Sequence, residues 1–190
     1  MELTLPTGPL SDAILTVVQE TEVPAVANHS VRSFFFARGI AERDGLVCDR
    51  DLLFAATVMH DLGTGALAKG EARFEVEGAD LAAELLREHG VGEADVDQVW
   101  EAIALHTSAG IAERRGGLAY LTRAGVGADF RATDERMLAE YPHLDLPTRL
   151  VDAIVERAER SAAASAPFTV GGELLRERRA SGVTRLESLS

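Results

Sequence analysis

The chain has 190 residues and a formal net charge of −12 at pH 7, and 46% of its residues are hydrophobic. A chain of this length and apolar content can bury one well-packed domain, which excludes a disordered protein. The acidity argues against nucleic acid and anionic membrane surfaces as partners, because proteins that bind them usually present a basic face. We therefore expect a small-molecule substrate. For the quaternary structure we expect a homo-oligomer such as a dimer, because this is the commonest type of assembly.

Cys48 is the single cysteine, which excludes a disulfide within the chain and suits a reducing compartment. Residues 1–10 contain no basic region and no long apolar stretch. The sequence also lacks the run of about 18 apolar residues that a membrane span requires. These features predict a cytoplasmic protein.

Helix signals recur along the chain in order. Ser11 and Asp12 offer an N-cap for the first helix, Pro24 suits the first turn of the second, and Gly90 is typical of a helix end. The predicted helices cover 13–21, 24–43, 49–61, 75–89, 93–106, 118–129, 134–141, 148–163 and 171–180, with a loop at 64–73. Segments that alternate between apolar and polar residues are absent from the sequence, so we predict an all-α fold.

The dipeptide His60-Asp61 is the most informative feature of the sequence. It ends an apolar run, residues 52–59, where an imidazole and a carboxylate can reach one metal ion from the last turn of a helix. His29 upstream and Asp129 downstream can supply two further ligands. Burying such groups without partners is costly, and a cation removes that cost. We expect one divalent transition metal, zinc first, with iron, manganese or nickel as alternatives.

Each of these residues also has an ordinary structural explanation. A lone histidine on an apolar helix usually lies in the core, and His60-Asp61 alone fits a charged helix end. We leave two other histidines out of the site: His89 complements a helix dipole, and His143 is interpreted as a turn residue. The metal hypothesis depends on the four ligand candidates taken together.

The segments around these residues resemble the HD-domain superfamily of metal-dependent hydrolases, and within it the cyanamide hydratase-like group. The resemblance is carried by NHSVR (28–32), VMHDLGT (58–64), RFEVEGAD (73–80), AIALHT (102–107) and GVGAD (125–129). It implies a single all-α HD-domain helical bundle over residues 1–190. The HD core would cover about 25–130, and the C-terminal helices about 134–180. The implied metal ligands are His29, His60, Asp61 and Asp129.

The resemblance also bears on the number of metal ions. Two-metal members carry an extra histidine four residues before the glycine of the helix that follows the HD motif. Counting back from Gly78 gives Phe74, whose ring cannot bind a metal. His106 matches the other histidine of the second site but lacks this partner. We therefore predict a mononuclear centre, with His106 free to hydrogen-bond substrate or water.

Metal binding would supply the chemistry, since a divalent ion lowers the pKa of bound water from about 15.7 to near 7. We assign Asp61 to orienting or deprotonating this water and His106 to general acid or base catalysis. The candidates for substrate binding or for orienting these groups are Asn28, Arg32, Thr64, Lys69 and Glu77.

Two enzymatic functions are compatible with this site. Water could add across a carbon–nitrogen multiple bond, as in the conversion of cyanamide to urea, or it could attack a phosphate ester. Phosphate binding favours clustered Lys and Arg, whereas acidic residues surround Lys69 and Arg73. We therefore favour hydration of a small substrate. A non-catalytic regulatory HD module is a third alternative, although such proteins usually lose a ligand.

Overall fold

The computed structural model describes residues 3–131 and 133–189, and within them it contains nine α-helices and no strand. The α-helices are α1 (Pro9–Thr21), α2 (Pro24–Asp44), α3 (Arg50–Val58), α4 (Phe74–Glu88), α5 (Glu93–Ala104), α6 (Gly117–Asp129), α7 (Glu135–Glu140), α8 (Leu146–Ala158) and α9 (Val170–Ser181). Short 3-10 helices cover Leu62–Thr64, Ala112–Arg114 and Glu187–Leu189. The predicted all-α fold is confirmed. No helix of the described chain combines the length and apolarity that spanning a bilayer requires.

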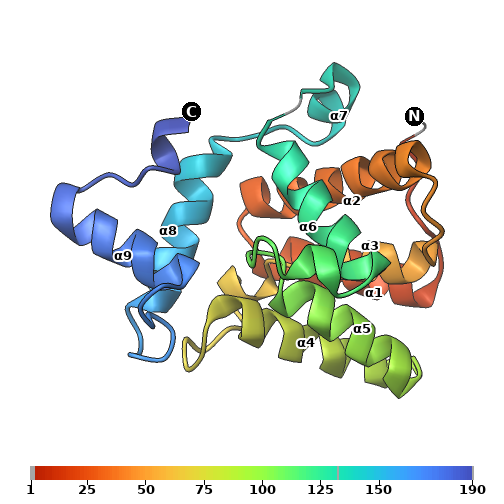
Figure 1. The fold of residues 1–190 in the computed structure, drawn as a ribbon, viewed down its shortest axis with the longest axis horizontal. Coiled ribbons are helices and arrows are strands. Elements are labelled where there is room, and N and C mark those ends of the chain that lie inside the picture. Colours follow the sequence, from red (N-terminus) through yellow and green to blue (C-terminus); the bar gives the residue numbers. More distant parts are fainter. Residues whose placement is uncertain (1–2, 132, 190) are drawn as a thin grey trace.

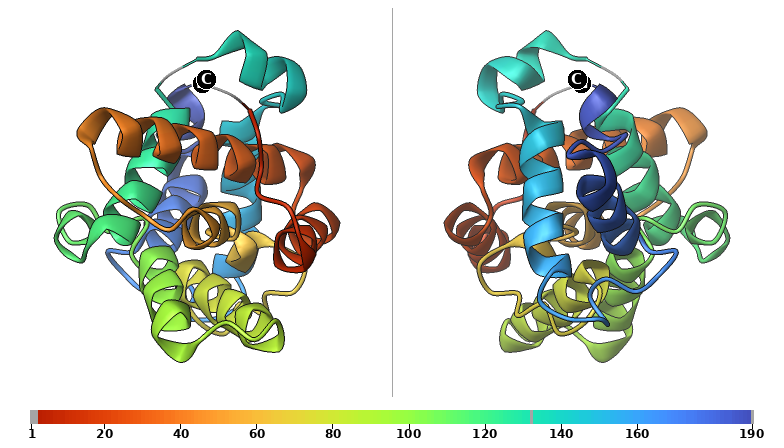
Figure 2. Two further views of the ribbon diagram at one scale, coloured as in Figure 1. Left: turned by 90° about the vertical axis from the view of Figure 1, so that its right-hand side faces the viewer. Right: turned by 90° about the vertical axis from the view of Figure 1, so that its left-hand side faces the viewer.

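Helices α1 to α6 form a bundle, and α8 and α9 pack against each other at one side of it (Figure 1). The right-hand view of Figure 2 shows α8 and α9 side by side in front of the bundle. The bundle has its own hydrophobic core. A second, smaller core joins α8 and α9 to the bundle through Val26 of α2 and Phe74 of α4. The seam between the two parts is where the candidate site lies.

Several helix boundaries follow the sequence signals. Pro24 opens α2, and Gly45 ends it with a left-handed φ of 64°. The Asp49 carboxylate caps α3 by accepting the backbone N–H groups of Asp51 and Leu52. These boundaries are therefore fixed by local chemistry.

The end of α3 differs from the prediction, which extended this helix to Asp61. The helix ends at Val58, and His60 and Asp61 lie in the turn that leads into the 3-10 helix. His60 Nδ1 lies 2.7 Å from the Thr57 carbonyl oxygen. That carbonyl would otherwise accept the N–H of Asp61 in a continuing helix. The His60 side chain therefore replaces a helical hydrogen bond.

Helix α5 ends in the same way, two residues before the predicted end at His106. It stops at Ala104, and His106 Nδ1 lies 2.7 Å from the Ile103 carbonyl oxygen. Both histidines therefore follow a helix end and bind a carbonyl three residues upstream. Their Nε2 atoms are left to point away from the helices that precede them.

Close packing of α2 against α6 depends on Gly125. A Cβ atom at this position would overlap the Ser33 carbonyl oxygen and crowd the Ala37 side chain of α2. Glycine inside a helix is costly, and here the close approach of α2 requires it. The approach matters for function, since His29 and Asp129 lie on these two helices.

We expect Gly125→Ala to lower the free energy of unfolding by about 1–3 kcal/mol, because the added methyl group meets backbone rather than a movable side chain. Gly127→Ala on the same helix is the matched control. Its Cβ would meet only the end of the flexible Arg131 side chain. The gain in helix propensity of up to about 1 kcal/mol should therefore show there. Urea unfolding of the two variants measures the difference, and equal effects would contradict the packing account.

Candidate metal centre

His29, His60 and Asp61 come together in the interior of the protein. One ligand atom from each lies within 4.8 Å of the others, and all three residues are buried. His29 is on α2, whereas the other two are in the turn after α3. The structure thus joins groups that are about thirty residues apart in the sequence, as the metal hypothesis requires.

Histidine nitrogens surround the Asp61 carboxylate. Its Oδ2 atom lies 3.1 Å from His60 Nε2 and 4.0 Å from His29 Nε2, and its Oδ1 atom lies 3.7 Å from His106 Nε2. The His60 and His106 rings are in edge contact, with centroids 4.8 Å apart. His106 therefore belongs to the same cluster as the three predicted ligands.

Hydrogen bonds fix which nitrogen of each ring carries the proton when the imidazole is neutral. The Nδ1 atoms of His60 and His106 each donate to a backbone carbonyl, and that of His29 donates to Asp129 Oδ2 at 2.7 Å. In a neutral imidazole the Nε2 atom then carries the lone pair. All three Nε2 atoms face the Asp61 carboxylate.

Two buried polar atoms of the cluster lack a hydrogen-bond partner within the described residues. Although His60 Nε2 and Asp61 Oδ2 are 3.1 Å apart, neither makes a hydrogen bond of acceptable geometry within the described residues. Buried polar atoms left in this state are costly, and a shared cation would satisfy both. Imidazole nitrogen with carboxylate oxygen suits a divalent transition metal. The residues present therefore fit the predicted ion.

The electrostatics of the cluster agree with this fit. Burial alone would raise the pKa of Asp61, but the surrounding histidines outweigh it and hold that pKa well below its usual range. Burial would lower the pKa of His60, but the adjacent Asp61 carboxylate raises it above its ordinary value. The cluster thus keeps a carboxylate ionised in a buried position, which favours binding of a cation.

Asp129 lies on the opposite side of the His29 ring from Asp61. It accepts the His29 Nδ1 hydrogen bond, and its two oxygens also accept from Arg32 Nε and Nη2, each at 2.7 Å. This is the arrangement by which a carboxylate orients a metal-binding histidine. Asp129 is outside the compact group of ligand atoms. Its assignment as a direct ligand stays a prediction.

Arg32 and Asn28 connect this carboxylate to the segment before α8. Arg32 Nη1 donates to the Tyr141 carbonyl at 2.8 Å, and Asn28 Nδ2 donates to the Pro142 carbonyl at 2.9 Å. The predicted orienting role of Arg32 has a clear geometric basis, since it holds Asp129 in place. Asn28 contributes by fixing the neighbouring loop.

A cavity of about 290 Å³ adjoins the cluster. Its polar lining residues are His29, His60, Asp61, His106, Thr107 and Arg123. The remaining lining is Gly127 and a set of apolar side chains, Phe74, Val126, Phe130, Leu150, Ile154, Val170 and Leu186. The cavity therefore opens from the metal centre into the seam between the bundle and the C-terminal helices.

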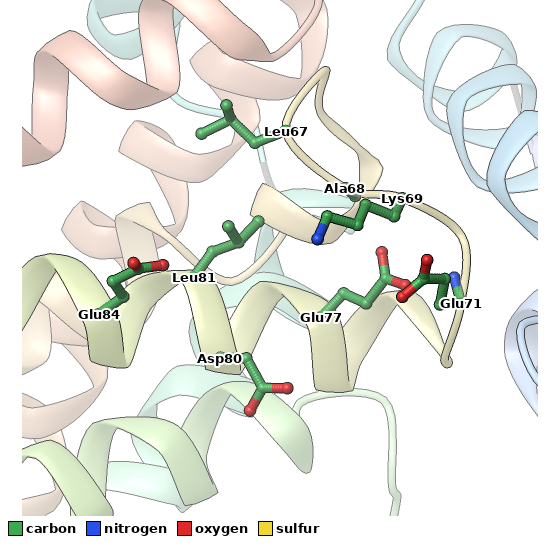
Figure 3. Close-up of a pocket in the computed structure, with 8 residues that line it drawn as sticks. All are labelled: Leu67, Ala68, Lys69, Glu71, Glu77, Asp80, Leu81 and Glu84. Atoms are coloured by element: carbon green, nitrogen blue, oxygen red, sulfur yellow. The ribbon is translucent and has the colours of Figure 1, made fainter.

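All five predicted substrate or orienting residues lie outside this cavity lining, and Asn28 and Arg32 have the contacts given above. Thr64 is buried at the end of the 3-10 helix after Asp61. Lys69 and Glu77 line a separate hollow beside α4 (Figure 3). There the Glu77 carboxylate accepts the backbone N–H groups of residues 70–72, so it holds the loop in place. Their roles in substrate binding stay predictions.

Sequence reasoning missed several residues of the site. Thr107 directly follows His106 and lines the cavity, where its hydroxyl donates to Glu75 Oε1 at 2.6 Å. Glu75 is one of the acidic residues near Arg73 that argued against phosphate binding, and in the structure it is buried and pairs with Arg73 at 2.8 Å. Its position just before the amphipathic stripe of α4 was the available signal.

The His106 side chain gives the metal-free protein a pH dependence. Burial and then the charge of His60 lower the pKa of His106 to about 4. In the unfolded chain a histidine has a pKa of about 6.5. Between about pH 6.5 and about pH 4 the unfolded chain therefore binds a proton that the folded chain does not, and the free energy of unfolding decreases as the pH falls.

His106→Gln should remove this contribution. We expect the unfolding free energy of the metal-free wild type, relative to the variant, to decrease as the pH is lowered through that window. Urea titrations at several pH values measure it. A difference that is constant with pH, or that increases towards acid, would contradict the buried neutral state of His106.

An all-helical bundle with a buried cluster of two histidines and an aspartate is compatible with a metal-dependent hydrolase. The chain matches the HD domain over residues 26–163, and it belongs to this family. The match continues past residue 130 into α8 and includes all four predicted ligands. No curated protein matches the chain significantly.

Proposed function

We propose that the protein activates water at a mononuclear metal centre and adds it to a carbon–nitrogen multiple bond of a small molecule. The observation that carries the proposal is the convergence of three imidazole Nε2 atoms on the Asp61 carboxylate, beside a largely apolar cavity. Zinc is the ion that we expect first at such a donor set.

The ion, when bound, supplies a Lewis acid that makes water a usable nucleophile near neutral pH. Asp61 orients the attacking water through its carboxylate. His106 is within the cluster but donates only its Nδ1 proton to a backbone carbonyl, so its Nε2 atom is available to receive or return a proton. Thr107, held by Glu75, offers its hydroxyl oxygen to the substrate in the cavity.

Packing around Phe74 supports a single metal ion. The Phe74 ring lies against His106, with ring centroids 5.7 Å apart. An apolar ring thus occupies the place where a second metal ion would need another ligand beside His106. This supports the proposal that His106 serves substrate or water.

The charge of the cavity favours this reaction over hydrolysis of phosphate esters. Arg123 is the single Lys or Arg among the described residues that line it. Its guanidinium already donates to the His106 carbonyl and to Glu113. Phosphate sites usually gather several free cationic donors.

The direct test is a screen of the zinc-loaded protein against cyanamide, organic nitriles and generic phosphate esters, with urea, ammonia, amide and phosphate as readouts. Turnover of a carbon–nitrogen compound is the expected result. Release of phosphate alone would replace the proposal with a phosphohydrolase. Zinc binding without any turnover would favour a regulatory module.

His106→Ala should keep the metal and slow turnover by about 10²–10⁴-fold, which is the usual contribution of a general acid or base. His89→Ala is the matched control, because His89 makes a similar Nδ1 bond to a backbone carbonyl at the exposed C-terminal end of α4. Metal content and steady-state rates of both variants are measured together. Loss of the ion in His106→Ala would instead make His106 a ligand.

A further inference from the structure

We infer that the substrate carries an apolar body, and that the C-terminal helices α8 and α9 help to form its binding site. This inference rests on the proposed function, because it identifies the chemical class of molecule presented to the metal centre. It goes beyond cyanamide, which has only three non-hydrogen atoms. The basis is the chemistry and size of the cavity walls.

The walls of the cavity come from two parts of the fold. The bundle contributes Phe74, Val126 and Phe130, while α8 contributes Leu150 and Ile154. Val170 of α9 and Leu186 near the C-terminus complete the apolar lining. Every polar side chain in the lining belongs to the metal cluster or is Thr107 or Arg123. Away from the reacting groups, the cavity therefore offers apolar contacts.

The size of the cavity matches a molecule several times larger than cyanamide. A water molecule takes up about 30 Å³ in the liquid, so about 290 Å³ corresponds to roughly ten water-sized groups. A substrate of three heavy atoms would leave most of the apolar wall in contact with water. A chain or ring of up to about eight carbons next to the reacting group would cover it.

The apolar surface of the cavity is not filled by the protein itself. Phe130, Val170 and Leu186 pack against the smaller core but remain only partly buried. The Phe130 ring lies over His29, with centroids 5.0 Å apart, so this uncovered surface continues to the metal centre. A ligand bound there would bury apolar area and reach the reacting groups at the same time.

The test is the affinity of the protein for a series of straight-chain alkyl nitriles, from acetonitrile to decanenitrile, measured by calorimetry on zinc-loaded and on metal-free protein. Each added methylene should tighten binding about fourfold, which corresponds to about 0.8 kcal/mol per buried methylene. The gain should stop near eight carbons, when the cavity is full. Affinity that does not depend on chain length would overturn the inference.

Two substitutions locate the binding site. Leu186→Ala should weaken octanenitrile binding by about tenfold through lost apolar contact, whereas Val183→Ala, at an exposed position in the same segment, should not change it. Val170→Phe should fill part of the cavity and weaken octanenitrile more than propionitrile, with unchanged zinc content. Equal effects of the Leu186 and Val183 changes would place the apolar site elsewhere.

The outcomes separate this inference from the proposed function. Chain-length-dependent binding without turnover of any carbon–nitrogen compound would retain the apolar site and reject the hydration chemistry. Turnover of cyanamide with no preference for longer nitriles would retain the chemistry and reject the apolar substrate.

Discussion

His60→Ala should reduce zinc affinity by about 100-fold or more and abolish turnover. Changes to residues that only orient metal ligands already cost about 10–100-fold, so loss of a ligand itself should cost at least as much. The substitution removes the Nε2 atom that faces Asp61 Oδ2 at 3.1 Å. Zinc affinity is measured by competition with a chelator, and turnover by the substrate identified in the screen.

Asp61→Asn tests the second residue of the His60-Asp61 pair with almost no change in the shape of the side chain. The amide carries no charge, so the ionised group around which the three histidines gather is lost. We expect the same loss of zinc and of activity. His143→Ala, in an exposed loop, is the control and should behave as wild type. Activity retained in both His60→Ala and Asp61→Asn would refute the assignment of the centre.

Asp129→Asn should lower the free energy of unfolding of the metal-free protein by about 3–5 kcal/mol, the usual cost of breaking a buried ion pair. Arg32 and Asp129 are each 1% exposed in their side chains and form two hydrogen bonds at 2.7 Å. Without the carboxylate, Arg32 keeps its charge in the interior, and its remaining partners are neutral: the amide oxygen left at position 129 and the Tyr141 and Pro142 carbonyls.

This effect should depend on pH in a definite direction. Burial raises the pKa of Asp129, but the hydrogen bonds from His29 and Arg32 outweigh it and lower that pKa to about 2. The contribution of the carboxylate is therefore complete above about pH 4 and is lost as the pH falls towards about 2. Urea unfolding at several pH values should show the difference between wild type and variant shrinking in this range.

Arg43→Ala provides a matched comparison for the buried pair. Arg43 and Asp44 form a similar double hydrogen bond, but the arginine side chain is 68% exposed. Exposed pairs contribute about 0–1 kcal/mol, so this change should have little effect. Similar losses in Asp129→Asn and Arg43→Ala would contradict the account of Asp129 as a buried support of His29.

The sequence allowed much of the fold to be predicted, because local signals set most helix boundaries. Pro24 and Gly45 delimit α2, and Asp49 caps α3. The early ends of α3 and α5 could not be predicted in this way. There, His60 and His106 bind backbone carbonyls that would otherwise continue the helix. Such bonds depend on where the side chains are held by the rest of the fold.

The candidate site was predictable in part for a related reason. The polar pair at the end of an apolar run identified His60 and Asp61, and with His29 upstream they form the group that the structure brings together. The position of Asp129 on the far side of His29 depends on its pairing with Arg32, which spacing alone does not reveal. The apolar wall from Leu150 and other C-terminal residues depends on long-range packing against the bundle.

Metal stoichiometry tests the central claim most directly. Metal-free protein is dialysed against zinc, and bound metal is measured by elemental analysis alongside His60→Ala. The account predicts one equivalent of zinc per chain in the wild type and its loss in the variant, because the cluster around Asp61 forms one site. Two equivalents, or none, would contradict it.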